Sequence, residues 1–220
     1  PCVRVIYATK DYHVDLVAYA WRKANGIETF ELAHKTDGWR PADPPALISF
    51  VERTREPFKD TKDTATQTDQ FRRVVRCLKR WNDEAIPTES DDKPSGLAFV
   101  LLCATTLQPT TTVAGKPDDL KATLGVATFA AAWPGRLILK KPTPEYDDVL
   151  EKLSDEAMPD LKARFAKLAK VLEKAAREAD PVEACKLLRT VFGEDFPVPE
   201  PEETARRTAA PAIITSSSSA

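Results

Sequence analysis

One change in hydrophobic periodicity, near residue 43, constrains the fold of this chain more than any other feature. Before it, residues 2–8, 12–20 and 29–34 carry apolar side chains in the two-residue alternation of β-strands. The short segment TKD joins the first two runs, which predicts a pair of adjacent strands. After residue 43 the apolar residues recur at helical spacing instead. The sequence therefore predicts an α+β fold, with strands first and a mainly helical part after them.

The strongest predicted helix covers residues 63–86. Its apolar side chains recur on a single face: Phe71, Val74, Val75, Leu78, Trp81 and Ala85. An earlier helix is predicted to begin at Pro44 and Pro45, which suit a first helical turn. From Leu97 the chain is apolar on all sides, which predicts a helix buried in the middle of the fold. Further helices are predicted over residues 118–133, 159–179 and 180–193.

The charge balance and the cysteines limit the class of protein. The 32 Lys and Arg residues nearly equal the 34 Asp and Glu residues, so a broad nucleic-acid-binding surface is not favoured and any anion site must be local. The four cysteines include no Cys-x-x-Cys pair, so they are interpreted as small core residues rather than as zinc ligands. No apolar run is long enough to cross a bilayer. We therefore expect a cytoplasmic protein with no membrane segment.

Composition and periodicity divide the chain into three predicted parts. Residues 1–60 contain the strands, residues 61–198 form a helical lobe, and residues 199–220 form a flexible tail rich in Pro, Glu, Thr, Ala and Ser. The first strand begins at residue 2, and Pro1 stands where an initiator methionine would stand. We expect from this that the sequence opens within a sheet whose earlier strands it does not include.

Asp15 needs an explanation because it interrupts the apolar strand YHVDLVAYA. Burying a carboxylate in a strand costs several kcal/mol unless a cation meets it. One interpretation is an ion-paired structural residue near a strand end. The other is a ligand for Mg²⁺, which binds one or two carboxylates together with substrate phosphates. The pattern alone leaves both interpretations open.

A basic stripe on the predicted helix 63–86 is the second candidate feature. Arg72, Arg76 and Lys79 lie at positions i, i+4 and i+7, so their side chains share one side of the helix. Such a stripe is either a solvated face or a local anion site.

The tetrapeptide KPSG, at residues 93–96, opens the next helix. Ser95 can present a hydroxyl, Gly96 permits the close approach of a ligand or a backbone, and free N–H groups at a helix start can donate to phosphate oxygens. An ordinary helix start would use the same residues. The tetrapeptide therefore indicates a phosphate site only in combination with other features.

In this order the segments resemble the cGAS/DncV-like nucleotidyltransferases (CD-NTases). This family belongs to the polymerase-beta nucleotidyltransferase superfamily, with the oligoadenylate synthases and poly(A) polymerases. The stretches that carry the resemblance run from residue 2 to about residue 197: CVRVIY, YHVDLV, GWRPADP, QFRRVVRCLKRWND, KPSGLAFVLLC and FGEDFP. The resemblance implies that residues 1–60 are part of the nucleotidyltransferase core with its sheet, and that residues 61–198 are the helical C-terminal lobe.

The resemblance also implies roles for three residues. In such enzymes three carboxylates hold two Mg²⁺ ions, with Mn²⁺ as the alternative ion, for in-line phosphoryl transfer. Asp15 matches the third carboxylate, Lys79 the lysine that reaches the triphosphate, and Ser95 the phosphate-contacting serine. The family's Gly-Ser loop and paired Asp-x-Asp are expected upstream of residue 2 and are not in this sequence. We therefore expect the 220-residue chain alone to be inactive.

The function implied by the resemblance is the synthesis of a cyclic di- or trinucleotide second messenger from NTPs, ATP among them, in bacterial antiphage defence (CBASS). In some such systems an E1–E2-like enzyme joins the C-terminal residue to a target, which makes Ala220 a candidate conjugation site; plain disorder is the alternative for this tail. Two other functions stay open. One is a non-catalytic module that binds a nucleotide or a partner protein. The other is an RNA-extending nucleotidyltransferase, although the charge balance lacks the basic surface that this would need.

Overall fold

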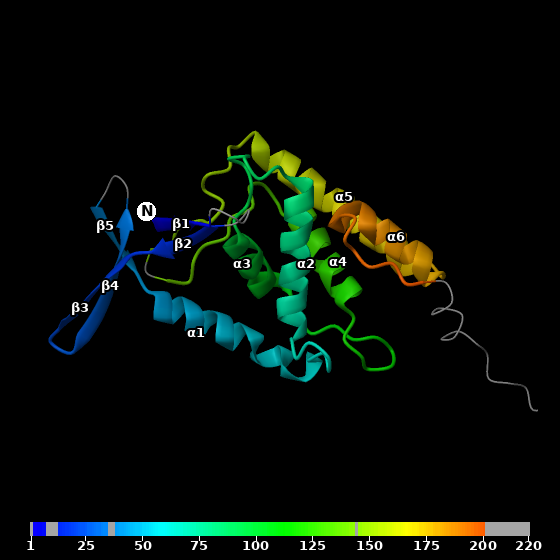
Figure 1. The fold of residues 1–220 in the computed structure, drawn as a ribbon, viewed down its shortest axis with the longest axis horizontal. Coiled ribbons are helices and arrows are strands. Elements are labelled where there is room, and N and C mark those ends of the chain that lie inside the picture. The colour runs from blue at the N-terminus through cyan, green and yellow to red at the C-terminus, as the bar shows by residue number, and fades with distance from the viewer. Residues whose placement is uncertain (1, 8–12, 35–37, 144, 201–220) are drawn as a thin grey trace, which may run out of the picture.

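Five β-strands form two antiparallel sheets in the computed structural model, which describes residues 2–7, 13–34, 38–143 and 145–200. In chain order they are β1 (Cys2–Ile6), β2 (His13–Val17), β3 (Tyr19–Ala24), β4 (Ile27–His34) and β5 (Gly38–Ala42). β1 pairs with β2, and the other three strands form a sheet in the order β3-β4-β5. Both sheets lie to one side of the helices that follow (Figure 1).

The predicted strand pair is confirmed, but the run over 12–20 is not one strand. β2 ends at Val17, and β3 begins at Tyr19 in the second sheet. β3 and β4 are joined by Asn25 and Gly26, whose φ angles of 51° and 79° fit the two-residue turn that right-twisted hairpins favour. The periodicity predicted the end of β4 and missed β3 and β5. The predicted TKD turn lies outside the described residues.

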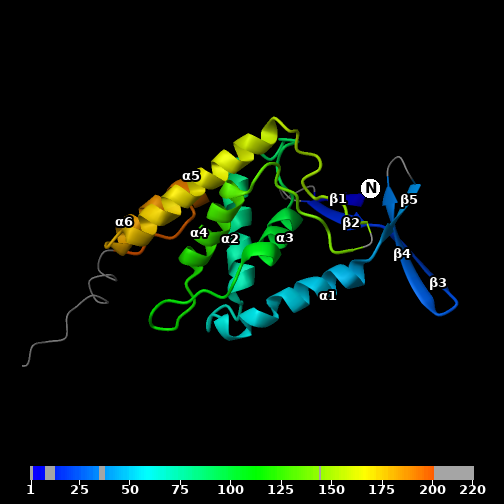
Figure 2. The same cartoon turned by 180° about the vertical axis from the view of Figure 1, so that it is seen from behind.

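Six α-helices and one short 3-10 helix, η1, follow in the described part of the chain. They are α1 (Pro44–Arg55), η1 (Glu56–Thr61), α2 (Gln70–Ala85), α3 (Gly96–Thr106), α4 (Asp119–Ala132), α5 (Ala157–Arg177) and α6 (Pro181–Phe192). α1 runs from the sheets to the start of α2, as the views from both sides show (Figures 1 and 2). Asp43 caps α1 by accepting the N–H of Ala46 at 2.9 Å, so the prediction of a helix opening at Pro44 is confirmed.

The prediction that a helix begins at residue 63 is wrong by seven residues. The Asp63 carboxylate accepts the backbone N–H of Thr66 at 2.7 Å and that of Ala65 at 3.2 Å. This local turn competes with the helical hydrogen-bond pattern. α2 then begins at Gln70, because Asp69 caps it by accepting the N–H of Arg72 at 2.9 Å.

The hydrophobic core lies among α2, α3, α4 and α5. α2 presents the predicted apolar face to this core, with Ala85 only partly buried, and α3 is buried as predicted. Trp81 lies at the centre, with its ring 4.7 Å from that of Phe165 on α5 and 6.4 Å from that of Phe99 on α3. α5 packs against both α4 and α6. The core therefore fixes α2 and α3 relative to each other.

The predicted α+β class, with a mainly helical C-terminal part, is confirmed. The strands end at Ala42 and the helices run from Pro44 to Phe192. The predicted division at residue 60 falls inside η1 and stays a prediction, as do the roles given to the two parts. Most of the predicted tail, residues 201–220, lies outside the described residues. Within the described ranges, no helix combines the length and apolar character that a membrane span needs.

Candidate functional site

Two of the three predicted site residues, Lys79 and Ser95, come together where α2 faces the start of α3. The chain leaves α2 at Ala85, reverses through residues 86–95, and enters α3 at Gly96 with Ser95 as the N-cap residue. A Cβ atom built on Gly96 would lie 2.8 Å from Cε and 3.0 Å from Nζ of Lys79. The Lys79 ammonium group therefore lies against the first turn of α3.

The local electrostatics favour an anion at this position. Ser95 makes no side-chain capping bond, and both Ser95 and Lys79 are exposed. No carboxylate among the described residues pairs with Lys79, whereas Lys93, two residues before Ser95, pairs with Asp83 at 3.0 Å. A helix start offers free N–H donors and the positive end of the helix dipole. An unpaired ammonium group beside such donors suits a phosphate group.

Asn82 supports this junction and was missed by the sequence analysis. It lies on α2, three residues after Lys79, and its Nδ2 donates to the carbonyl oxygen of Pro94 at 3.2 Å. The residue is only 4% exposed, and its Oδ1 has no hydrogen-bond partner within the described part of the chain. A polar residue four positions after Leu78, on the apolar face of a helix, is the sequence signal that could have identified it.

Asp15, the third predicted residue, is not buried. β1 and β2 pair Arg4 with Asp15, and the guanidinium group donates to both carboxylate oxygens, at 2.8 and 3.0 Å. The Asp15 side chain is 36% exposed, and its neighbours Val14 and Leu16 are also exposed. The prediction of a buried strand is therefore wrong, because this sheet is open on the sides that the apolar residues face. Arg4 is the cation that meets the Asp15 carboxylate in this strand pair.

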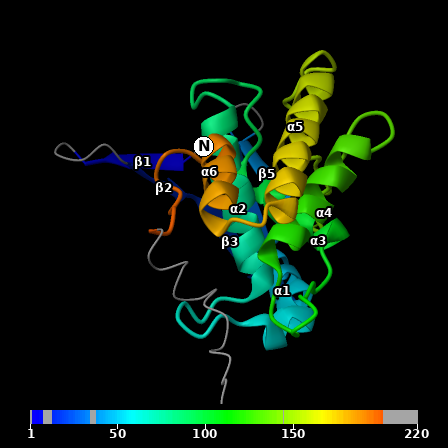
Figure 3. The same ribbon diagram turned by 90° about the vertical axis from the view of Figure 1, so that its right-hand side faces the viewer.

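The structure does not bring Asp15 to the Lys79–Ser95 junction. Seen end-on, β1 and β2 extend to one side of α2, while α3 and α4 lie on the other (Figure 3). Arg4 occupies one lone-pair position on each Asp15 oxygen and competes electrostatically with any metal ion there. No group of three His, Cys, Asp or Glu residues within the described ranges is placed to hold a metal ion. The metal role of Asp15 therefore stays a prediction.

The prediction that the cysteines are small core residues is confirmed for Cys103, and Cys77 packs against the core. Cys103 is buried, and Cys77 and Cys185 are partly buried. Burial, with a smaller contribution from Asp119, raises the pKa of the Cys77 thiol to about 11. Burial also raises the pKa of Cys103. Neither thiol is therefore a nucleophile near neutral pH.

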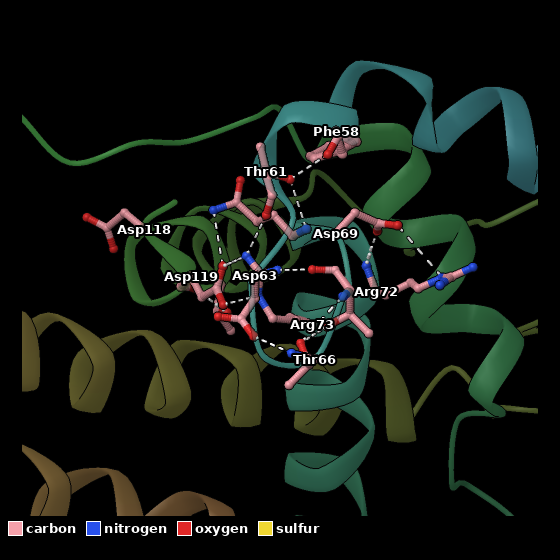
Figure 4. A network of polar contacts seen from close by, with 12 residues as sticks. Phe58, Thr61, Asp63, Thr66, Asp69, Arg72, Arg73, Asp118 and Asp119 are labelled. Carbon is pink, nitrogen blue, oxygen red and sulfur yellow. Dashed lines mark hydrogen bonds and ion pairs between the residues drawn. The ribbon is translucent and has the colours of Figure 1, made fainter. Parts of the chain in front are cut away.

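A network of polar contacts joins α2 to η1 and α4 (Figure 4). Arg73 pairs with Asp119 through two contacts, Nε to Oδ2 at 2.6 Å and Nη2 to Oδ1 at 3.0 Å, and also donates to the carbonyl oxygens of Thr61 and Thr68. The Gln70 carboxamide exchanges hydrogen bonds of 2.9 and 2.8 Å with the backbone of Thr110. These side chains satisfy one another, so the network holds the helices together and offers no open ligand position.

Asp69 belongs to the same region and gives the fold an acid-sensitive contact. Burial raises the pKa of Asp69, but hydrogen bonds from the Arg55 side chain and the Arg72 N–H, together with the charges of both arginines, outweigh it and lower the pKa. The shorter Arg55–Asp69 contact is 2.7 Å. A lowered folded-state pKa stabilises the fold above the unfolded pKa of about 4, and this contribution is lost as the pH falls through the folded-state value.

Replacing Asp69 with asparagine is therefore expected to destabilise the protein by about 1–3 kcal/mol at pH 7. The difference from wild type should begin to shrink below about pH 4, where Asp69 takes up a proton in the unfolded wild type, and should vanish only below the lowered folded-state pKa. Urea unfolding at pH 7 and at pH 3 measures both values. Asp118→Asn is the matched control, because Asp118 caps α4 through the N–H of Lys121 and has no arginine partner within the described ranges. Equal losses in the two variants, or a loss that does not depend on pH, would contradict this role of Asp69.

The chain and its fold were compared with known proteins. No family model matches the chain, and no curated protein matches it. Among solved structures, the fold is that of about half of a di-nucleotide cyclase.

The matching structures include DncV from two bacteria. DncV of Vibrio cholerae in complex with ATP, GTP and 5MTHFGLU2 matches with a TM-score of 0.65 and 16% identity, over 88% of this chain and 51% of that chain. The V. cholerae structure described as a cyclic AMP-GMP synthase and prokaryotic cGAS homolog gives a TM-score of 0.67 and 17% identity, over 89% and 51%. Escherichia coli DncV, bound to 3'-deoxy GTP, gives 0.63 and 16%, over 88% and 50%. The chain thus spans about half the length of these structures, and at this identity the likeness shows the fold alone.

Proposed function

We propose that this chain is part of a nucleotidyltransferase that makes a cyclic di- or trinucleotide second messenger from NTPs in antiphage defence. The observation that carries the proposal is the Lys79 ammonium group, which has no carboxylate partner among the described residues and lies against the start of α3 at Ser95, in a chain whose fold is similar to part of DncV. Solved DncV structures hold ATP, GTP or a nonhydrolysable GTP, which supports nucleoside triphosphates, ATP among them, as substrates.

In this proposal Lys79 and Ser95 bind the triphosphate from the helical part, residues 61–198. Lysine suits this position because its ammonium group is a compact charge on a flexible stem. Asp15, in the sheet-bearing part over residues 1–60, would supply one carboxylate ligand for a metal ion. Mg²⁺, when bound, would neutralise charge on the phosphates. The reaction would take place in the cytoplasm. Conjugation of Ala220 by an E1–E2-like enzyme stays a prediction, because Ala220 lies outside the described residues.

A non-catalytic nucleotide- or protein-binding module is the second candidate function. The bidentate Arg4–Asp15 pair favours it, because this contact gives Asp15 a structural role that needs no metal ion.

The test is an assay of the protein as its gene encodes it, incubated with Mg²⁺ and mixed NTPs. Products that resist phosphatase are separated by chromatography and identified by mass. A cyclic di- or trinucleotide is the expected product. NTP binding without any product, both alone and with the proteins encoded beside it, would favour the binding module. A growing ladder of linear products would indicate the RNA-extending alternative.

Replacing Lys79 with alanine is expected to raise the Kd for Mg-ATP by about 10- to 100-fold, because a charge-assisted hydrogen bond contributes about 1.5–3 kcal/mol. Calorimetry measures the affinity. Lys170→Ala, an equal change of charge at an exposed position on α5, should leave the Kd nearly unchanged. Equal losses in the two variants would indicate a general effect of net charge and would argue against a phosphate contact at Lys79.

A further inference from the structure

The first turn of α3 has no side chain at the one position that the Lys79 side chain crosses. The Cβ of any other residue at position 96 would lie 2.8 Å from Lys79 Cε and 3.0 Å from Nζ, closer than real Cβ contacts. The atoms in the way belong to the far end of a flexible side chain rather than to the backbone. A larger residue at position 96 would therefore displace the Lys79 ammonium group and leave the helix intact.

The backbone does not explain this glycine. Five glycines of the described residues have a positive φ, which other residues rarely adopt, and Gly96 is not among them: Gly26, Gly38, Gly115, Gly135 and Gly193. Gly96 is the first residue of α3, directly after the N-cap Ser95, and this position accepts other residues as well. The close approach of Lys79 is the feature of the structure that accounts for glycine here.

Asn82 has one structural contact and one buried polar atom without a partner. Its Nδ2 donates to the Pro94 carbonyl just before Ser95, while its buried Oδ1 has no hydrogen-bond partner in the part of the chain that the structure describes. Native proteins contain few such unsatisfied buried atoms, and sites that break local rules are often functional. Gly96 and Asn82 therefore both act on the segment where Lys79 meets α3. Asn82 holds the segment through its hydrogen bond to Pro94, and Gly96 leaves space for the Lys79 side chain beside it.

We infer that Gly96 is a positioning residue of the triphosphate site. Because it has no side chain, the Lys79 ammonium group can lie across the first turn of α3. The inference rests on the proposed function, because the triphosphate is the ligand that Lys79 would bind. Gly96 does not touch the phosphate itself. Its effect on binding must therefore pass through Lys79.

The test compares Gly96→Ala with Gly125→Ala in the protein as its gene encodes it. Gly125 lies on α4, and an added Cβ there would meet nothing within 4 Å. Both variants should keep or raise the melting temperature. Gly96→Ala alone should weaken binding of Mg-ATP and of inorganic tripolyphosphate, by about tenfold, since it withdraws one charge-assisted contact. A fall in melting temperature with Gly96→Ala alone would show that the backbone needs glycine, and would overturn the inference.

A double-mutant cycle separates this inference from the proposed function. In the Lys79→Ala background, Gly96→Ala should have no further effect on either ligand, because the side chain through which it acts is gone. If Lys79→Ala weakens binding and Gly96→Ala does not, or if the two effects add, the role of Gly96 is wrong and the phosphate contact of Lys79 stands. If Lys79→Ala leaves binding unchanged, the proposed site fails and the role of Gly96 fails with it.

Discussion

Replacing Arg73 with methionine is expected to lower the free energy of unfolding by about 2–3 kcal/mol, since hydrogen bonds to charged groups contribute about 1.5–3 kcal/mol and the partner carboxylate of Asp119 is 35% exposed. The Arg73 side chain is 16% exposed and bonds to Asp119 and to the carbonyl oxygens of Thr61 and Thr68. Methionine fills similar space but removes the charged donor from Asp119, Thr61 and Thr68, and leaves Asp119 with the Gln70 amide and Thr68 with the Asp63 N–H. Urea unfolding at neutral pH, followed by circular dichroism, measures the loss.

The adjacent Arg72 provides the control. Its side chain is 47% exposed and lies 3.7 Å from Asp69, so Arg72→Met should cost less than about 1 kcal/mol. Adding Asp119→Leu to Arg73→Met removes the abandoned carboxylate and should recover part of the loss. A loss for Arg73→Met no greater than that for Arg72→Met would contradict the structural importance of the network.

The helices could be predicted because their signals are local. Each apolar face repeats within one turn, and Asp43, Asp69, Asp118 and Asp180 cap the helices that follow them. The error at the start of α2 has a local cause as well. Residues 63–69 were joined to the helix although Asp63 and Asp69 are typical of a turn and a cap. The Asn25–Gly26 pair is a strong hairpin signal of the same kind, and using it would have identified β3.

The network around Arg73 could not be predicted, because its partners are distant in sequence. Arg73 and Asp119 are 46 residues apart, and Gln70 reaches Thr110 across 40 residues. Nothing in the local pattern distinguishes Arg73, whose side chain is mostly buried, from the exposed Arg72 and Arg76 beside it. Only the packing of α2 against α4 decides which arginine is enclosed.

The phosphate-binding roles of Lys79 and Ser95 came from the family resemblance and stay predictions. The structure shows that both residues lie at the α2–α3 junction, which the local pattern alone did not predict. Asn82 was hidden among the core positions of α2. The prediction that Asp15 lies in a buried strand was wrong, because alternating apolar residues predict a strand but not which elements cover it. The pairing register with β1, which brings Arg4 opposite Asp15, is also not a local property.

Replacing Asp15 with asparagine is expected to lower product formation at least about a thousandfold if Asp15 is a metal ligand, since metal stabilisation of a reacting phosphoryl group is worth several kcal/mol. The melting temperature should change little, because an exposed ion pair contributes about 0–1 kcal/mol. The measurement uses the protein as its gene encodes it. The rate of cyclic product formation with Mg²⁺ and mixed NTPs is compared with the thermal unfolding of each variant.

Arg4→Met distinguishes the two interpretations of Asp15, because both substitutions break the same ion pair across β1 and β2. A purely structural Asp15 predicts that both variants lose a little stability and keep the activity of the parent. A metal ligand requires them to differ: Asp15→Asn loses activity, whereas Arg4→Met keeps the carboxylate and frees it from a competing cation. Equal activity of the two variants would therefore refute the metal role, even if both were less active than the parent. An activity difference without a stability difference would assign Asp15 to the chemistry and Arg4 to holding it before the metal arrives.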